Sequence, residues 1–279
     1  MVSFAKGHGT RNDFILLNDP DQERPLTSED VRFLCDRRSG LGADGVLRAV
    51  RAAHVDGWEG DPTLWFMDYR NADGSIAEMC GNGLRVFARS LVQTGLIDPS
   101  QDRIEVGTRA GLRTAEFLPD QRIRVGMGCP RLGREVQISL AGTNELDAVA
   151  VDVGNPHAVV LLHPAQDLDS LDLRHRPRWD PSGAFPDGVN VEFVERVGDH
   201  RLRMRVFERG VGETQSCGTG TVAAVTAVAQ AEDQDSGEWR VDVPGGSVAV
   251  ELRDGEAWLT GPAVIVAYGE VALPSEERG

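Results

Sequence analysis

Residues 77–83 (AEMCGNG) and residues 214–220 (TQSCGTG) are two versions of one short pattern centred on a cysteine. In each, Cys-Gly-x-Gly opens an apolar segment that can form a buried helix. Glycines at such a point allow backbone N–H groups to approach a ligand closely, and the start of a helix favours negative charge. The two stretches therefore predict two helices that each begin at a cysteine, in related halves of one chain.

Helices are expected at three places. Residues 82–94 place Leu84, Phe87, Ala88, Leu91 and Val92 on one face, and a glycine at 95 ends the pattern. Residues 219–231 (TGTVAAVTAVAQA) are apolar nearly all round, so this helix should be surrounded by protein. A capping box at residues 27–30 (TSED) predicts a further helix that ends near residue 37.

Most of the remaining chain alternates apolar and polar residues with period two, which predicts strands. These strands are expected at residues 13–17, 45–50, 63–69, 103–106, 113–118, 122–125, 147–153, 158–162, 190–195, 201–208, 238–243, 247–252 and 264–273. Lys6 falls in a further strand expected at the N-terminus. Strands that enclose a central helix, twice over, define an α+β fold and not a β-α-β alternation.

Other repeated anchors support an internal duplication. Residues 12–17 (NDFILL) match residues 155–160 (NPHAVV), and the DGV at residue 44 matches the DGV at residue 187; both pairs are 143 positions apart. The two cysteines are 137 positions apart, so a small change of length separates the anchors. The halves are expected to meet at residues 125–131, where two glycines and a proline suggest a linker.

Composition excludes several classes of protein. The net charge of −15 over 279 residues argues against a nucleic-acid partner, which requires clustered positive charge. The sequence shows no signal-peptide pattern and no apolar run as long as the roughly 20 residues of a membrane helix. With few cysteines and no disulfide framework, a reduced, cytoplasmic protein is expected. Lys6 is the only lysine, and its place in a strand disfavours a pyridoxal phosphate enzyme, which needs a Schiff-base lysine.

The cysteines are the strongest candidates for chemistry. Cys80 and Cys217 stand at helix starts, where a thiol pKa falls and a carboxylate can bind. One thiolate and one thiol on opposite faces of a carbon could invert it without a cofactor, as in an amino-acid racemase or epimerase. Cys35 and Cys129 are expected to be buried structural thiols. No cysteine has the spacing of a metal ligand, so no metal is expected.

Several polar residues near these motifs could bind a substrate, and each has an ordinary structural alternative. The asparagines could bind substrate or serve as turn residues: Asn12, Asn71, Asn82, Asn155 and Asn190. Glu208 and Arg209 could hold an ammonium and a carboxylate, or form a surface ion pair. His157 could tune a thiol or simply pack at a strand end.

These motifs resemble the diaminopimelate epimerase family over nearly the whole chain. The matching runs are residues 12–14 (NDF), 70–75 (RNADGS), 79–83 (MCGNG), 154–157 (GNPH), 189–191 (VNV), 208–214 (ERGVGET) and 217–221 (CGTGT). The resemblance implies conversion of LL-2,6-diaminopimelate to the meso form, without a cofactor, in lysine and peptidoglycan precursor synthesis. It also implies a cytoplasmic homodimer of two pseudo-symmetric domains, each a mostly antiparallel, barrel-like sheet around a central helix. The last strand would return to the first domain, giving domains of residues 1–126 with 264–279 and of residues 127–263.

Carried over by matching motif, the resemblance implies a role for each site residue. Cys80 and Cys217 would donate and accept the proton, with His157 and Glu208 modulating the thiols. The reacting carboxylate would be held by Gly81, Asn82, Gly218 and Thr219. The substrate, chiefly its distal head, would be recognised by Asn12, Asn71, Asn155, Asn190, Glu208 and Arg209.

The chain departs from the family pattern at two positions, and other functions remain open. Gly45 stands where many members have a glutamine, and residues 9–12 (GTRN) replace a more usual Gly-x-Gly-Asn. A proline racemase or hydroxyproline epimerase would share the two-cysteine logic and the fold. A non-catalytic thiol or zinc-binding module is the alternative from another class.

Overall fold

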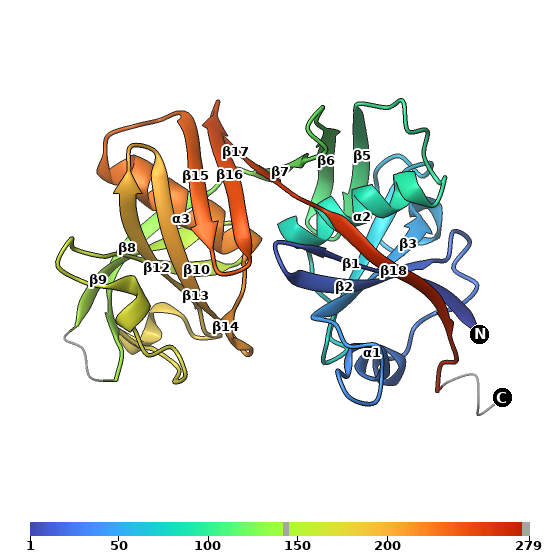
Figure 1. The fold of residues 1–279 in the computed structure, drawn as a ribbon, viewed down its shortest axis with the longest axis horizontal. Helices are drawn as coiled ribbons and strands as arrows, with labels where there is room; N and C mark the ends of the chain where they lie inside the picture. The colour runs from blue at the N-terminus through green and yellow to red at the C-terminus, as the bar shows by residue number, and fades with distance from the viewer. Residues whose placement is uncertain (142–144, 275–279) are drawn as a thin grey trace. The chain divides into compact units, whose positions relative to one another are not determined.

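The computed structural model describes residues 1–141 and 145–274, which form two compact units (Figure 1). Unit 1 is Met1–Val125 together with Gly261–Gly279, and unit 2 is Gly126–Thr260. Residues 275–279, which the sequence assigns to the first domain, lie outside the described residues.

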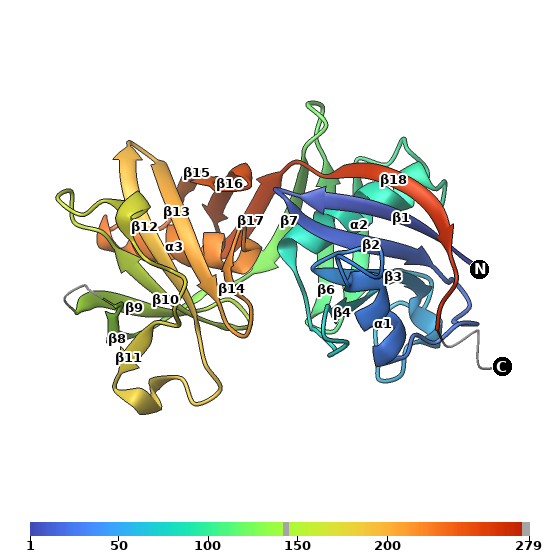
Figure 2. The same ribbon diagram turned by 60° about the horizontal axis from the view of Figure 1, so that its bottom comes forward.

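The described residues of unit 1 contain eight strands and one long helix. In chain order its strands are β1 (Val2–Gly9), β2 (Asn12–Asn18), β3 (Gly45–Arg51), β4 (Trp65–Asn71), β5 (Arg103–Thr108), β6 (Gly111–Phe117), β7 (Ile123–Gly128) and β18 (Val264–Val271). Neighbouring strands follow the order β18-β1-β2-β3-β4-β5-β6-β7, with parallel pairing only at β2–β3 and β4–β5. The C-terminal strand β18 therefore joins the N-terminal unit beside β1 (Figure 2).

Unit 2 repeats this arrangement. Its main strands are β8 (Arg131–Ser139), β9 (Leu146–Asp152), β10 (Pro156–Leu161), β12 (Asn190–Gly198), β13 (Arg201–Glu208), β15 (Gly237–Val243), β16 (Gly246–Arg253) and β17 (Glu256–Gly261). They follow the order β8-β9-β10-β12-β13-β15-β16-β17, again with parallel pairing only at the third and fifth junctions. Two short strands, β11 (Arg178–Asp180) and β14 (Gly212–Thr214), pair with β8 and β13.

The identical succession of antiparallel and parallel pairs confirms the α+β fold with two pseudo-symmetric halves. Along the chain, each half places its long helix between the fifth and sixth strands of this order, β4 and β5 in unit 1 and β13 and β15 in unit 2. In unit 1 this is α2 (Gly81–Gln93), which packs against β1, β2 and β18, and in unit 2 it is α3 (Gly218–Ala231), which packs against β9, β10 and β12. Both helices are seen against their sheets in Figures 1 and 2.

The helices follow the expected sequence signals. In α2 the predicted face is buried at Leu84, Phe87, Ala88 and Leu91, and α3 is buried almost throughout, which confirms that protein surrounds it. After α2 the chain turns at Gly95, whose φ of 73° is a conformation that favours glycine. The third helix, α1 (Ser28–Cys35), begins after Thr27, which forms the predicted capping box with Asp30.

Two expectations about the region between the units need correction. The expected linker at residues 125–131 is largely strand, because β7 continues to Gly128 and β8 begins at Arg131. Cys129 lies between these strands and is exposed, so the expectation that it is buried was wrong, whereas Cys35 is buried as expected. None of the helices within residues 1–141 and 145–274 is long and apolar enough to cross a bilayer.

Candidate functional site

Each central helix begins at one of the two motif cysteines. Cys80 is the N-cap of α2, and its Sγ accepts a hydrogen bond from the backbone N–H of Gly83 at 3.3 Å. Cys217 is the N-cap of α3, and its Sγ accepts from the N–H of Gly220 at 3.4 Å. Both cysteines have extended backbone, as N-cap residues do. The two halves therefore present a sulfur in the same position, against the exposed amides of a long helix.

Two of the predicted asparagines gather around Cys80. The Cys80 thiol lies 3.7 Å from Oδ1 of Asn12, and Nδ2 of Asn82 donates to the same oxygen at 3.3 Å. Nδ2 of Asn12 in turn donates to Oδ2 of Asp44 at 2.8 Å. Asn71 lies at the end of β4, where its amide donates to Oγ of Ser75. The structure thus links Asn12 and Asn82 to Cys80, while the side-chain amide of Asn71 takes part in a turn.

A buried arginine beside Cys80 was not among the predicted residues. Arg85 is fully buried in α2 and donates to Oδ1 of Asn82 at 2.9 Å and to Oγ1 of Thr10 at 3.3 Å. Burial lowers the pKa of the Arg85 guanidinium to about 10, and a negative charge on Cys80 acts in the opposite direction. An arginine inside the apolar face of a predicted helix, three positions after Asn82, was the signal in the sequence.

The predicted residues of unit 2 are held in place by short contacts. Nε2 of His157 lies 2.9 Å from Oδ1 of Asn155, and Oδ1 of Asn190 accepts from the backbone N–H of Arg209 at 2.9 Å. Oγ1 of Thr214 donates to Oε1 of Glu208. Thr219 Oγ1 lies 3.5 Å from the Cys217 sulfur. The polar residues that the sequence predicted for the site therefore lie near strand ends, and they make these contacts there.

Glu192 is a second residue that the predictions missed. Its Oε1 lies 2.7 Å from Nδ1 of His157, and both side chains are completely buried. Burial raises the pKa of the Cys217 thiol well above its usual value, and the negative charges of Glu208 and Glu192 act in the same direction. The signal was a single carboxylate within an otherwise nearly apolar buried strand, residues 189–194 (VNVEFV).

The structure shows what fills the space beside Gly45, the position at which many members of the resembling family have a glutamine. A Cβ at this position would lie 2.7 Å from the ring of Tyr69 and 2.7 Å from the carbonyl oxygen of Arg70. The Tyr69 ring therefore occupies the room that a side chain at residue 45 would need. In the matching parallel strand pair of unit 2, the corresponding position is Asn190.

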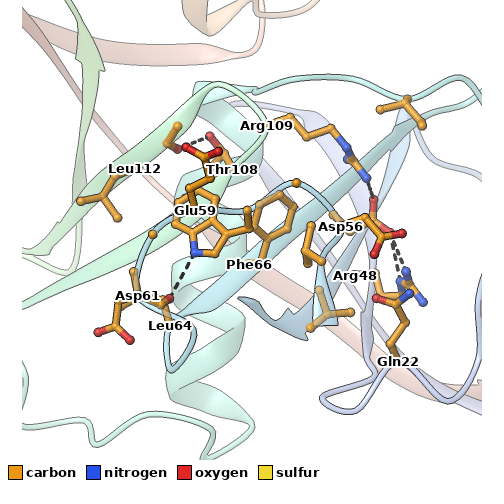
Figure 3. A pocket seen from close by; sticks show the side chains of 18 of the residues that line it. Gln22, Arg48, Asp56, Glu59, Asp61, Leu64, Phe66, Thr108, Arg109 and Leu112 are labelled. Carbon is orange, nitrogen blue, oxygen red and sulfur yellow. Dashed lines mark hydrogen bonds and ion pairs between the residues drawn. The ribbon is translucent and has the colours of Figure 1, made fainter. Parts of the chain in front are cut away.

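Unit 1 also contains a cavity of about 890 Å³ that is separate from these groups (Figure 3). Its lining includes Trp58 and Phe66, and none of the predicted site residues. Asp68, which is almost completely buried, bonds Arg48 and Arg109 at one side of it. The arginines there are thus engaged in holding a carboxylate of the protein itself. Within the described ranges, no cluster of three or more His, Cys, Asp or Glu side chains could hold a metal ion.

Solved structures define the class of fold. Over 98% of this chain and 99% of the other, the structure is similar to a PhzF-family phenazine biosynthesis protein of Bacillus anthracis, with a TM-score of 0.69 and 16% identity. A probable proline racemase of Agrobacterium radiobacter matches with a TM-score of 0.68 and 17% identity, over 98% and 93% of the two chains. The molecule therefore has the two-domain fold shared by these proteins.

Sequence comparison assigns the family. The model of the diaminopimelate epimerase family matches residues 4–133 and 149–273. A diaminopimelate epimerase of Corynebacterium glutamicum is 49% identical over 98% of this chain and 99% of its own. One of Rhodococcus opacus is 48% identical, with 97% of each chain covered. The chain belongs to the diaminopimelate epimerase family, as the sequence motifs indicated.

A matched pair of substitutions tests the packing at the two helix starts. A Cβ on Gly220 would lie 2.5 Å from Oε1 of Glu192, whereas a Cβ on Gly83 meets only ordinary contacts at 3.4 Å. We expect Gly220→Ala to lower the free energy of unfolding by about 1–3 kcal/mol through overpacking. Gly83→Ala should leave it unchanged or raise it by up to about 1 kcal/mol, since alanine favours a helix. Urea unfolding of both variants makes the comparison, and equal effects would contradict it.

Proposed function

We propose that this chain interconverts LL-2,6-diaminopimelate and meso-2,6-diaminopimelate. The observation that carries the proposal is a pair of cysteines, each capping a buried helix, in a member of the diaminopimelate epimerase family. The chain is accordingly an isomerase that acts on a small molecule, and its reaction belongs to lysine and peptidoglycan precursor biosynthesis. Epimerisation of purified protein, followed by separation of the stereoisomers, is the direct test.

The proposed reaction is a transfer of protons between two thiols and one carbon. A thiolate removes the α-proton from one face, and the electron pair of the C–H bond moves into the adjacent carboxylate. The thiol on the opposite face then returns a proton to the carbon and becomes the thiolate. Each thiol is thereby acid in one direction and base in the other. The reaction consumes no external acid, base or redox cofactor.

The charges beside the sulfurs support an assignment for the resting protein. Arg85 is a buried cation near Cys80, and cations favour a thiolate. Cys217 lies near the carboxylates of Glu208 and Glu192, which favour the neutral thiol. In the proposal, Cys80 is therefore the thiolate and Cys217 the thiol before substrate binds.

The helix starts would stabilise the carboxylate of the reacting centre. In the proposed reaction, the exposed N–H groups of α2 and α3 would bind the carboxylate on which charge accumulates as the proton leaves, as in an oxyanion hole. In this proposal the carboxylate is held by Gly81, Asn82, Gly218 and Thr219. The rest of the substrate is bound by Asn12, Asn71, Asn155, Asn190, Glu208 and Arg209, with His157 and Glu208 also modulating the thiols.

The distal head of the substrate distinguishes this proposal from a proline racemase. Diaminopimelate carries a second amino-acid head, which Glu208 and Arg209 could bind by its ammonium and its carboxylate. Arg209 is exposed and its guanidinium contacts only the carbonyl oxygen of Asp187 among the described residues, so most of its donors are available. A cyclic substrate with a single head would offer neither residue a second head group to bind.

Loss of either thiol should abolish epimerisation. In Cys80→Ala or Cys217→Ala one face of the carbon lacks its acid or base, so we expect the rate of epimerisation to fall by about 10³-fold or more. Cys129→Ala, which removes an exposed thiol, is the matched control and should retain full activity. Chiral chromatography of the reaction mixture measures all three. An active Cys80→Ala or Cys217→Ala variant would refute the two-thiol mechanism.

Removal of the Arg209 side chain should weaken recognition of the second head. We expect Arg209→Ala to raise KM for diaminopimelate about tenfold or more, because a charge-assisted hydrogen bond is worth about 1.5–3 kcal/mol. Arg174→Ala removes an exposed arginine from the same unit and serves as the control. Steady-state kinetics on both variants decide the matter, and an unchanged KM in Arg209→Ala would remove the residue from the binding site.

We also propose a cytoplasmic homodimer, with β18 at the interface. The four cysteines are free, as in a reducing compartment. Strand β18 pairs with β1 alone in the described part of the chain, and three apolar residues along it are exposed: Val264, Val266 and Tyr268. An open edge with an apolar face favours association with a second copy.

A charged substitution on this strand should separate the dimer. Val266→Arg places a cation among these exposed apolar residues, where an apolar interface with a second copy would have to bury it. We expect the sedimentation coefficient to fall to that of a monomer at micromolar concentration. Val197→Arg, at an exposed apolar residue of unit 2, should leave the sedimentation coefficient unchanged. A wild-type protein that sediments as a monomer would refute the dimer.

A further inference from the structure

The matched strands of the two units carry different chemistry behind the two thiols. In unit 1, Phe14 on β2 and Leu47 on β3 are completely buried beneath the start of α2, each 3.4 Å from the Cβ that Gly83 would carry. The register of the parallel pair β10–β12 puts His157 and Glu192 at the corresponding positions of unit 2. Two apolar side chains in one half are therefore replaced by two ionisable ones in the other.

The hydrogen bonds of His157 restrict where its protons are. Nδ1 faces Oε1 of Glu192 at 2.7 Å, and Nε2 faces Oδ1 of Asn155 at 2.9 Å. Because an amide oxygen only accepts, Nε2 must carry a hydrogen in this arrangement. The contact between Nδ1 and Oε1 likewise requires one hydrogen between the imidazole and the carboxylate. Glu192 thus fixes both the orientation of His157 and the nitrogen that bonds Asn155.

The carboxylate of Glu192 also lies against the start of α3. Its Oε1 would be 2.5 Å from a Cβ on Gly220, the residue whose N–H bonds the Cys217 sulfur. Its Oε2 is buried and has no hydrogen-bond partner within the residues that the structure describes. A buried carboxylate oxygen without a partner is costly, and such groups occur where function requires them. The second glycine of the Cys-Gly-Thr-Gly motif gives this carboxylate its room.

We propose that Glu192 is a positioning residue for epimerisation, which holds His157 and through it Asn155, and which biases Cys217 toward the neutral thiol. The inference deepens the proposed function and rests on it. The titratable groups that act on Cys217 are Glu208, from the end of β13, and Glu192, from β12; His157 is the group that pairs with Glu192. Loss of the Glu192 carboxylate should therefore ease ionisation of Cys217 and release Asn155.

The decisive experiment measures the two consequences separately. In a Cys80→Ser background without substrate, alkylation of Cys217 by iodoacetamide is followed across pH by peptide mass spectrometry. We expect Glu192→Gln to move the midpoint to lower pH, so that Cys217 reacts about threefold faster or more below that midpoint. With Cys80 intact, kcat/KM for LL-diaminopimelate should fall about tenfold. Its pH profile should shift in the same direction as the alkylation curve.

Glu195→Gln is the matched control. It removes a carboxylate that also lies on β12 but forms an ion pair with Arg203 and not with His157. It should change neither the alkylation curve nor kcat/KM. If Glu192→Gln gives the same curve and the same pH profile as Glu195→Gln, the inference is overturned.

A second variant guards against a failure to fold. The double substitution His157→Phe with Glu192→Leu installs the apolar pair that unit 1 already accommodates at these positions. It should remain folded by circular dichroism and should move the Cys217 midpoint downward as Glu192→Gln does. An unmoved midpoint in the folded double variant also overturns the inference. Absence of epimerisation by the wild-type chain would instead refute the proposed function, and the two failures are distinguishable because alkylation needs no substrate.

Discussion

The hydrogen bond from a helix N–H group to a cysteine sulfur is the constraint on which the rest of each unit depends. It requires the cysteine to be the N-cap in extended conformation, with its side chain turned toward the third residue of the helix. The helix must then be buried along most of its surface so that its start is fixed in place. The curved sheet around α2 or α3 supplies that burial, and the glycines of the motif keep the helix start open.

A duplicated scaffold carries two different electrostatic environments. The strand order, the two parallel junctions and the position of the helix are the same in both units. The buried groups nearest the sulfurs, however, differ between the two units. Arg85 of α2 corresponds by motif alignment to Val222 of α3, and the apolar pair Phe14 and Leu47 corresponds to His157 and Glu192. Unit 1 thus buries a cation near its thiol, and unit 2 buries a carboxylate near its own.

Much of the fold could be predicted from the sequence because strong local signals determine its helices and strands. The three helices, most strands and the duplication follow from periodicity, from capping residues and from repeated anchors. The strands β8 and β17 were not expected: β8 is mostly exposed and polar over residues 131–135, so alternation is weak there. Cys129 was expected to be buried because free cysteines usually are, but its place between two strands exposes it.

The residues of the candidate site also fall into two groups, those that the sequence could predict and those that it could not. Residues inside a recognisable motif, such as Cys80, Asn82 and Cys217, could be named from the sequence. Arg85 and Glu192 could not, because a single charge in an apolar stretch gains its meaning only when the fold shows what it contacts. Strand register supplied that information for Glu192, since it placed the carboxylate beside His157 and under Gly220.

The proposed two-base reaction accounts for opposite charges beside equivalent thiols. In that reaction the pair of thiols would hold one proton between them, and two identical environments would not decide which sulfur keeps it. A difference of one pKa unit between the sulfurs corresponds to about 1.4 kcal/mol, so a few buried charges suffice to select one state. A much larger difference would make one protonation state scarce and so slow the reaction of the isomer that needs it, because the roles reverse when the product reacts. Arg85 lies near one sulfur, and Glu192, paired with the imidazole of His157, lies near the other. The pairing with a histidine means that the buried carboxylate in unit 2 is not left as an isolated charge.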